Sequence, residues 1–310
     1  MSDILFMGTP DFAVPSLAAL AGAGHRVIAV FTQPDRPAGR GRKLAPPPVK
    51  VWAEEHGLPV FQPPSLRTGE VLAHIRSLGP EVIAVAAYGK ILPGPILSVP
   101  PKGVLNVHPS LLPKYRGPSP IQSAILAGDA VTGVSIMLVD AGMDSGPILA
   151  QRQTPVAGHD TADVLEERLA KEGARLLVET LDGWLRGTIT PVPQDETRVT
   201  ISRKFTREDG KIAWGDHAIE IERKVRALNP WPGCYTKWRG AILKVIQAKA
   251  APGQGGELGA VVSQDAGRVA VVTGEGLLVL ERVQLEGRQQ MTARELVAGR
   301  HDFVGSRLGP

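Results

Sequence analysis

The chain has very little cysteine, few aromatic residues and no long apolar run. Its 310 residues include one cysteine, Cys234, and aromatic side chains make up 5% of them. A single cysteine excludes an internal disulfide framework and a cysteine-cluster zinc site. No apolar run approaches the ~18 residues that a membrane-crossing helix requires. The N-terminus, MSDILFMGTP, lacks the basic region of a signal peptide. We therefore expect a soluble, cytoplasmic protein.

The composition is that of a folded chain whose basic residues are clustered. Hydrophobic residues make up 43% of the sequence and charged residues 21%, which is typical of globular proteins. The net charge of +4 is by itself weak evidence for a nucleic-acid partner. Its distribution is more informative. Residues 36–50 contain five Lys or Arg and no acidic residue, and residues 203–244 contain ten Lys or Arg against five Asp or Glu.

The first 150 residues alternate short apolar runs with helical patterns. Strands are predicted at 3–8, 26–32, 81–89 and 103–108, and helices at 11–22, 47–57, 67–79 and 119–128. Strands with near-continuous apolar sequence are typical of parallel sheets buried on both faces. The alternation predicts a doubly wound, Rossmann-like and mostly parallel α/β sheet, which binds ligands at the carboxyl ends of its strands. Two more strands, at 133–140 and 146–153, and a helix at 161–186 complete this part.

The sequence changes character after Gly187, where it becomes polar and proline-containing. We expect a first domain over 1–188, a linker over 189–209 and a second domain over 210–310. In the second domain a helical stripe of apolar residues at 218–228 is followed by short runs that glycine-rich turns separate. Even spacing of this kind predicts a small OB-like antiparallel β-barrel.

The first strand ends in the wrong sequence for a dinucleotide fold. Such a fold carries G-x-G-x-x-G directly after its first strand, and here Gly8 is followed by TPDF. We therefore do not expect this sheet to bind NAD.

A polar pair interrupts the predicted strand at 103–108, which reads GVLNVH. Alternate residues of a strand point to one face, so Asn106 and His108 project together while Val107 points the other way. Pro109 favours an extended conformation at His108. The pair is thus expected at a carboxyl end, facing the ligand crevice. The alternative is a polar strand end in which His108 bonds a neighbouring backbone group.

A third polar element is the segment LVDAGMDSGPI, which contains Asp140 and Asp144. A loop with glycines can bring a carboxylate to a site built by other strands, or the aspartate can be an ordinary turn residue. The pattern does not choose between the two aspartates. Ser110 and Ser145 lie in no G-x-S-x-G nucleophile elbow. An amide, a histidine and a carboxylate instead suit direct transfer through a tetrahedral oxyanion.

These residues resemble the folate-dependent formyltransferases. The core NVHPSLLPKYRGPSPIQSAILAGDAVTGVSIMLVDAGMDSGPIL carries the resemblance to the whole family. The chain also resembles the members of this family that act on methionyl-tRNA, and this resemblance extends over about residues 1–245. The segments that carry this wider resemblance are FMGTPDFAVPSL, FTQPDRPAGRGRKLAPPPVK, LPVFQPPSLR, VAAYGKILP, QDETRVT and ALNPWPG.

The resemblance implies a reaction and the residues that perform it. It implies transfer of a formyl group from 10-formyltetrahydrofolate to the α-amine of methionine on initiator tRNA. It implies Asn106, His108 and Asp144 as catalytic residues, with no metal ion. It also implies a folate site, which would consist of Ser110, Leu111, Leu112, Pro113, Tyr88 and Gly89, the last two mainly through their backbone.

The basic segment 36–50 is interpreted as a tRNA contact. The residues concerned are Arg36, Arg40, Arg42 and Lys43, and the basic stretch 203–244 with the barrel is expected to hold the tRNA backbone. The alternative for 36–50 is a solvated charged loop. Two other functions remain open: a formyltransferase that acts on a purine precursor, a sugar amine or water, and a catalytically inactive RNA-binding module. We expect a monomer.

Overall fold

The computed structural model describes residues 2–38, 43–253 and 255–309. The chain forms two compact units, the first from residues 1–120, 131–155 and 166–202, and the second from residues 121–130, 156–165 and 203–310. The division at 188 and 210 that the sequence suggests stays a prediction. None of the helices in the described ranges is both long and apolar enough to cross a membrane.

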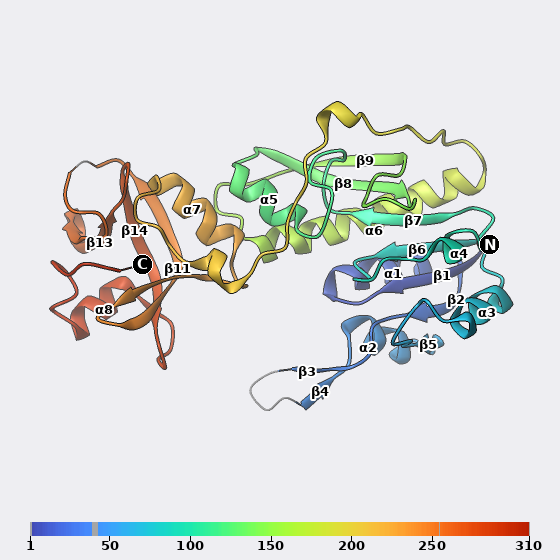
Figure 1. The fold of residues 1–310 in the computed structure, drawn as a ribbon, viewed down its shortest axis with the longest axis horizontal. Coiled ribbons are helices and arrows are strands. Elements are labelled where there is room, and N and C mark those ends of the chain that lie inside the picture. Colours follow the sequence, from blue (N-terminus) through green and yellow to red (C-terminus); the bar gives the residue numbers. More distant parts are fainter. Residues whose placement is uncertain (1, 39–42, 254, 310) are drawn as a thin grey trace. The chain divides into compact units, whose positions relative to one another are not determined.

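A seven-stranded sheet forms the centre of the first unit (Figure 1). The strand order is β5-β2-β1-β6-β7-β8-β9. The first five strands of this order are parallel, whereas β8 and β9 run antiparallel to their neighbours. The strands are β1 (Asp3–Gly8), β2 (Arg26–Phe31), β5 (Val60–Phe61), β6 (Val82–Ala86), β7 (Val104–His108), β8 (Val131–Leu138) and β9 (Ile148–Pro155). The predicted mostly parallel α/β sheet is confirmed.

Helices cover both faces of this sheet, because its strands are apolar on both sides. On one face Leu5, Val85 and Val104 join a core cluster with Ile75 of a helix. On the other face Gly173 lies so close to β7 that a Cβ there would be 2.7 Å from a methyl carbon of Val107. The helical elements are η1 (Asp11–Ala13), α1 (Val14–Gly22), α2 (Pro48–Glu55), α3 (Gly69–Leu78), α4 (Gly94–Leu97), α6 (Ala162–Leu185) and η2 (Glu196–Arg198).

The basic segment 36–50 differs from the expected loop. It contains an antiparallel hairpin of β3 (Arg36–Ala38) and β4 (Lys43–Ala45), and α2 begins at Pro48. Strands of three residues are too short to leave a periodic pattern, so the sequence did not reveal them. Arg40 and Arg42 lie outside the described residues.

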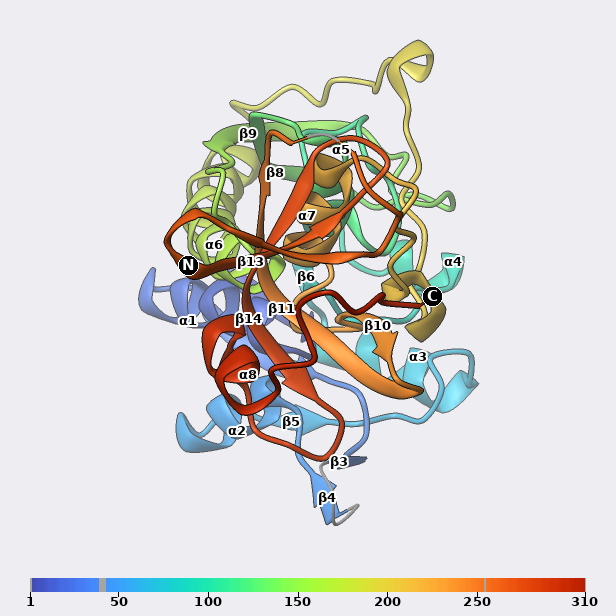
Figure 2. The same ribbon diagram turned by 90° about the vertical axis from the view of Figure 1, so that its left-hand side faces the viewer.

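An antiparallel sheet forms the core of the second unit (Figure 2). Its order is β10-β11-β14-β13-β12, with β15 paired to β14. The C-terminal segment joins both edge strands, because Gly309 donates to the carbonyl of Lys237 at 2.9 Å and Val261 to that of Ser306 at 2.8 Å. The strands are β10 (Cys234–Trp238), β11 (Ala241–Ala251), β12 (Val261–Gln264), β13 (Arg268–Val272), β14 (Leu277–Leu285) and β15 (Met291–Thr292). The predicted antiparallel β-domain is confirmed.

The predicted apolar stripe at 218–228 lies on a helix whose buried face packs into the core of the second unit. Ile221 and Val225 are 1% and 2% exposed and belong to that core. The same helix holds a loop, because Arg226 donates to the carbonyl of Asp160 at 3.1 Å. The helical elements of this unit are α5 (Pro120–Ala127), η3 (Arg207–Gly210), α7 (Ala218–Ala227), η4 (Asp265–Gly267) and α8 (Ala293–Gly299).

Candidate active site

Strand β7 carries the polar pair Asn106 and His108 to its carboxyl end. The strand lies between β6 and β8, with Asn106 opposite Met137 and His108 opposite Ser135. The alternation predicted from the sequence holds: both side chains share the face of Val104. Asn106 is half-buried and His108 is 4% exposed. Among the described residues, none hydrogen-bonds the Asn106 carboxamide, so its amide group is available to a ligand.

Both ring nitrogens of His108 face oxygen atoms. Nε2 lies 3.0 Å from the carbonyl oxygen of Tyr115, and Nδ1 lies 3.7 Å from Oδ2 of Asp144. Because a carbonyl only accepts, Nε2 carries the proton of the neutral ring and Nδ1 is its basic nitrogen. Burial lowers the pKa of His108 below its usual value of 6.5, and the Asp144 carboxylate opposes this in part. The ring is therefore neutral at pH 7 and can take up a proton beside Asp144.

The connection between β8 and β9 places Asp144, and not Asp140, beside His108. Asp144 adopts a left-handed conformation with φ of 51°, which aspartate tolerates better than most residues. Its Oδ2 accepts a hydrogen bond of 2.8 Å from the amide of Gly117. Asp140 instead accepts from the amide of Gly142 at 3.0 Å, in the turn-forming role that the sequence left open for either aspartate.

The two serines of these loops are not arranged as nucleophiles. Ser110 donates to the carbonyl of Lys114 at 2.5 Å, and Ser145 donates to Asp140 at 2.9 Å. Neither hydroxyl contacts His108, which would have to act as its base. The geometry therefore favours direct transfer over a covalent intermediate on the protein.

The predicted folate segment, residues 110–113, is a tightly bonded turn. Ser110 and Leu112 are buried, whereas Leu111 and Pro113 are partly exposed. Ser135 donates to the carbonyl of Ser110 at 2.6 Å and accepts from the amide of Leu112 at 3.0 Å. The side chains that this segment can offer to a ligand are thus those of Leu111 and Pro113.

The other predicted folate contacts, Tyr88 and Gly89, follow β6 at the same edge of the sheet. The Tyr88 side chain is 1% exposed, and burial raises its pKa to about 12. Its carbonyl accepts from Thr9 at 3.0 Å and from Gln33 at 2.8 Å. The Tyr88 side chain is therefore part of the protein interior. Gly89 is exposed and has φ of 79°.

Of the predicted tRNA contacts, Arg36 is the one whose side chain the structure describes. Its guanidinium donates to Gln33, which in turn donates to Tyr88. Burial and the charge of Arg36 lower the pKa of Lys90. Two cations, Arg36 and Lys90, therefore lie near the same strand ends. Lys43 begins β4.

The sequence did not reveal a segment that lies beside the predicted site although it is distant from it along the chain. Residues 194–202, here called the strap, run along the β8–β9 side of the sheet (Figure 1). Gln194 donates to the carbonyl of Asp144 at 2.8 Å and accepts from Arg116 at 2.9 Å. The segment QDETRVT, residues 194–200, carries part of the family resemblance, but no periodicity or spacing in the sequence assigns it a role.

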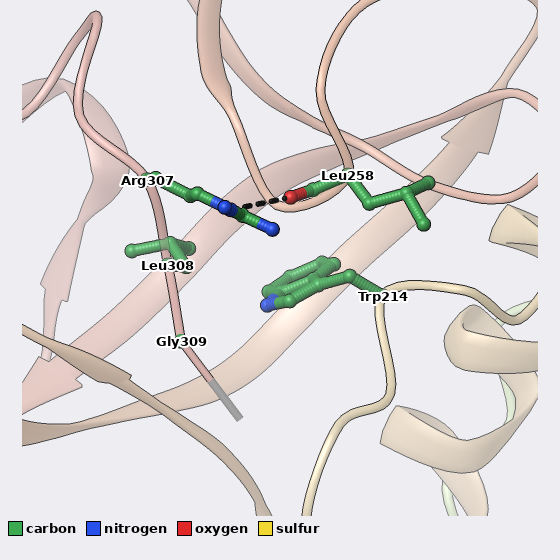
Figure 3. Close-up of a pocket in the computed structure, with 5 residues that line it drawn as sticks. All are labelled: Trp214, Leu258, Arg307, Leu308 and Gly309. Atoms are coloured by element: carbon green, nitrogen blue, oxygen red, sulfur yellow. Dashed lines mark hydrogen bonds between the residues drawn. The ribbon is translucent and has the colours of Figure 1, made fainter.

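A cavity of about 510 Å³ lies in the second unit and includes none of these residues. It is lined by Trp214, Leu258, Arg307, Leu308 and Gly309 (Figure 3). Arg307 crosses it and donates to the carbonyl of Leu258 at 3.1 Å. Within the described residues, no group of three or more His, Cys, Asp or Glu side chains is arranged to hold a metal ion.

Comparison with known proteins gives matches along nearly the whole chain. A family model described as formyl transferase matches residues 2–181, and one described as formyl transferase, C-terminal domain, matches residues 204–301. A methionyl-tRNA formyltransferase of Chloroflexus aurantiacus is 50% identical over 300 residues, which cover 96% of this chain and 97% of that protein. Another, of a Roseiflexus species, is 49% identical over 309 residues and covers 99% and 95%.

Solved structures are similar in fold at low sequence identity. The crystal structure of HypX from Aquifex aeolicus in complex with tetrahydrofolic acid matches with a TM-score of 0.66 and 17% identity. The match covers 98% of this chain and 48% of that one. At this identity the likeness supports the fold alone.

Proposed function

The chain belongs to the formyl transferase family, and we propose that it transfers the formyl group of 10-formyltetrahydrofolate to the α-amino group of methionine on initiator methionyl-tRNA. The observation that carries this proposal is the match at 50% identity, over 96% of this chain, to a protein named methionyl-tRNA formyltransferase. The product is N-formylmethionyl-tRNA, which serves translation initiation. In this role the protein acts in the cytoplasm as a monomer.

The proposed reaction joins the methionine nitrogen to the formyl carbon and breaks the bond from that carbon to N10 of the folate. Attack by the neutral amine gives a tetrahedral intermediate with negative charge on the formyl oxygen. Asn106 donates to this oxygen through its side-chain amide, which has no partner among the described residues. A donor aimed at developing charge is typically worth ~10²–10³ in kcat.

His108 and Asp144 handle the proton in this proposal. The nitrogen that attacks must lose one proton, and N10 must gain one as its bond to carbon breaks. The basic Nδ1 of His108, 3.7 Å from the Asp144 carboxylate, is suited to take up that proton and return it. While protonated, the ring also donates to the oxyanion, and the carboxylate stabilises its charge.

The folate is proposed to lie against Leu111 and Pro113 and beside the backbone at Gly89. These groups are partly or fully exposed and lie on loops that leave β7 and β6 at the same edge of the sheet. Ser110, Leu112 and Tyr88 support the site from within. The Ser110 hydroxyl, the Leu112 amide and the Tyr88 carbonyl are bonded to the protein, so these groups shape the folate site without reaching the ligand.

The tRNA is proposed to contact the β3–β4 hairpin and the basic stretch 203–244. Arg36, Arg40, Arg42 and Lys43 belong to a run of five basic residues without an acidic one. Phosphate contacts by such residues position a nucleic acid without reading its sequence.

Incubation of the purified protein with 10-formyltetrahydrofolate and methionyl initiator tRNA tests the proposal. We expect N-formylmethionyl-tRNA to form, with little product from elongator methionyl-tRNA and none from uncharged tRNA. Formylation of a purine precursor or an amino sugar in place of methionyl-tRNA would establish the alternative substrate class. Tight tRNA binding without single-turnover formylation would establish a binding module.

A further inference from the structure

The strap, residues 194–202, is hydrogen-bonded to the loop that contains Tyr115, whose carbonyl faces His108. The carbonyl of Thr200 accepts from the amide of Arg116 at 2.9 Å, and its hydroxyl accepts from the amide of Tyr115 at 2.8 Å. Ser202 donates to the carbonyl of Arg116 at 2.7 Å. Because the carbonyl of Tyr115 faces His108, the strap fixes the backbone that sets the ring's tautomer.

Gln194 extends the strap to the loop that carries Asp144. Its side-chain nitrogen donates to the carbonyl of Asp144 at 2.8 Å and to that of Gly146 at 2.7 Å. Its side-chain oxygen accepts from Nε of Arg116 at 2.9 Å. Arg116 only donates and the two carbonyls only accept, so the orientation of the Gln194 amide is determined by its partners. One side chain thus bridges both loops of the site.

Arg116 is held in place in turn. Its side chain is 7% exposed, and its two outer nitrogens donate to the carboxylate of Glu196 at 2.7 and 3.2 Å. A planar guanidinium bonded to Gln194 on one edge and to a carboxylate on another has little freedom to turn. The orientation of Gln194 is therefore set by a group whose own position is fixed.

We propose that Gln194 is a positioning residue, which sets the place of the Asp144 carboxylate relative to His108. The inference rests on the proposed function, since it concerns the same site. Asp144 is held at three points: its carboxylate by Gly117, its carbonyl by Gln194 and its left-handed backbone by the loop itself. Loss of the Gln194 bonds frees the carbonyl, and a displacement of ~1 Å at a reacting group can cost ~10² in rate.

Two substitutions of Gln194 test this inference. Gln194→Glu keeps the shape and the Arg116 partner but loses both donors, and Gln194→Met removes all three bonds at similar volume. We expect kcat for methionyl-tRNA formylation to fall about tenfold to a hundredfold in each, with both KM values within about threefold of wild type. A purely structural role would reduce the yield or melting temperature of the protein but leave the kcat of folded enzyme unchanged.

A control and a second background make the result specific. Gln153→Glu places the same charge at an exposed position on β9 and should leave kcat unchanged. In an Asp144→Asn background, measured by single turnover, Gln194→Glu should add less than about a twofold loss, because it acts through Asp144. A wild-type kcat in both Gln194 variants, a change confined to KM, or a full multiplicative loss in the Asp144→Asn background overturns the inference. Failure of the proposed function is distinct, because the wild-type protein would then not formylate methionyl-tRNA.

Discussion

His108 and Asn106 lie two residues apart on one strand, yet their side chains differ in burial and in hydrogen bonding. His108 is almost fully buried and both its ring nitrogens face oxygen atoms of the loops. Asn106 is half-buried, and its carboxamide is bonded to none of the described residues. A buried titratable ring suits proton transfer, whereas an available amide suits stabilisation of charge on a substrate oxygen.

Removal of either side chain should therefore affect the chemical step. We expect Asn106→Ala and His108→Ala each to lower kcat by about two orders of magnitude or more, because each loses a group that acts on the transition state. Folate binding, measured by equilibrium titration, should change by less than about threefold. Near wild-type turnover in either folded variant would contradict the assignment of that residue.

The burial of His108 also predicts a pH dependence of stability. Its pKa in the folded protein is lowered from 6.5, so the unfolded chain binds a proton that the folded chain resists. The free energy of unfolding should therefore decrease as the pH falls below about 6.5 and recover as it rises. Compared with His108→Asn, the wild-type protein should lose more stability between about pH 7 and pH 5, as measured by urea unfolding. A difference that is constant with pH, or of opposite sign, would contradict this.

Single residues also mark the limit of prediction from sequence. Strand alternation was enough to place Asn106 and His108 on one face. It could not choose Asp144 over Asp140, because that choice depends on how the loop after β8 turns. Gln194 was missed for a related reason: its three bonds reach residues that lie 48, 50 and 78 positions earlier in the chain, and local pattern carries no information about such contacts.

At the scale of elements, long periodic segments were predictable and short ones were not. The strands β1, β2, β6 and β7 and the helix α6 lie where apolar pattern placed them, within a few residues. The two-residue strand β5 and the β3–β4 hairpin were missed, because two or three residues cannot show a period of two. The polar stretch after Gly187 suggested a linker, which stays a prediction. The first part of this stretch bonds to the first unit through the backbone groups of Val192 and Ile148.

The base of the β3–β4 hairpin is bonded to the sheet, although its composition suggests a free loop. Lys50 donates to both carboxylate oxygens of Asp35 at 3.0 Å, and Gln62 donates to Asp35 at 2.7 Å. These bonds lower the pKa of Asp35. A hairpin anchored at its base holds Arg36 at a defined edge of the first unit, which supports the proposed tRNA contact.

Loss of two hairpin charges should weaken tRNA binding selectively. We expect Arg42→Ala combined with Lys43→Ala to raise KM for tRNA about tenfold and to reduce the slope of log KM against log salt by about two, one for each phosphate contact. The folate KM and the kcat at saturating tRNA should stay within about twofold. Lys171→Ala with Arg175→Ala removes the same charge from α6 and serves as the control. An unchanged salt slope would show that Arg42 and Lys43 make no phosphate contact and are solvated.

At the scale of the whole molecule, the residues proposed for catalysis and the basic stretch proposed for tRNA binding lie in different units. All the predicted catalytic and folate residues belong to the first unit, whereas the whole basic stretch 203–244 belongs to the second unit, which has its own core. Both domain models of the family match, one in each part of the chain. The sequence could predict an α/β part followed by an antiparallel part, because the hydrophobic period changes from strand–helix alternation to short strands separated by glycine.

The second unit should account for the salt dependence that remains without the hairpin charges. Lys237 of β10 and Lys244 of β11 are exposed, and the pairing of Tyr235 with Lys244 puts both lysines on one face of the sheet. Because counterion release adds over phosphate contacts, Lys237→Ala with Lys244→Ala should lower the salt slope by about two in the wild-type background and again in the hairpin variant. Folate KM should be unaffected in both. If the hairpin variant alone already abolishes the salt dependence of KM for tRNA, the second unit makes no phosphate contacts, and its basic stretch serves solubility instead.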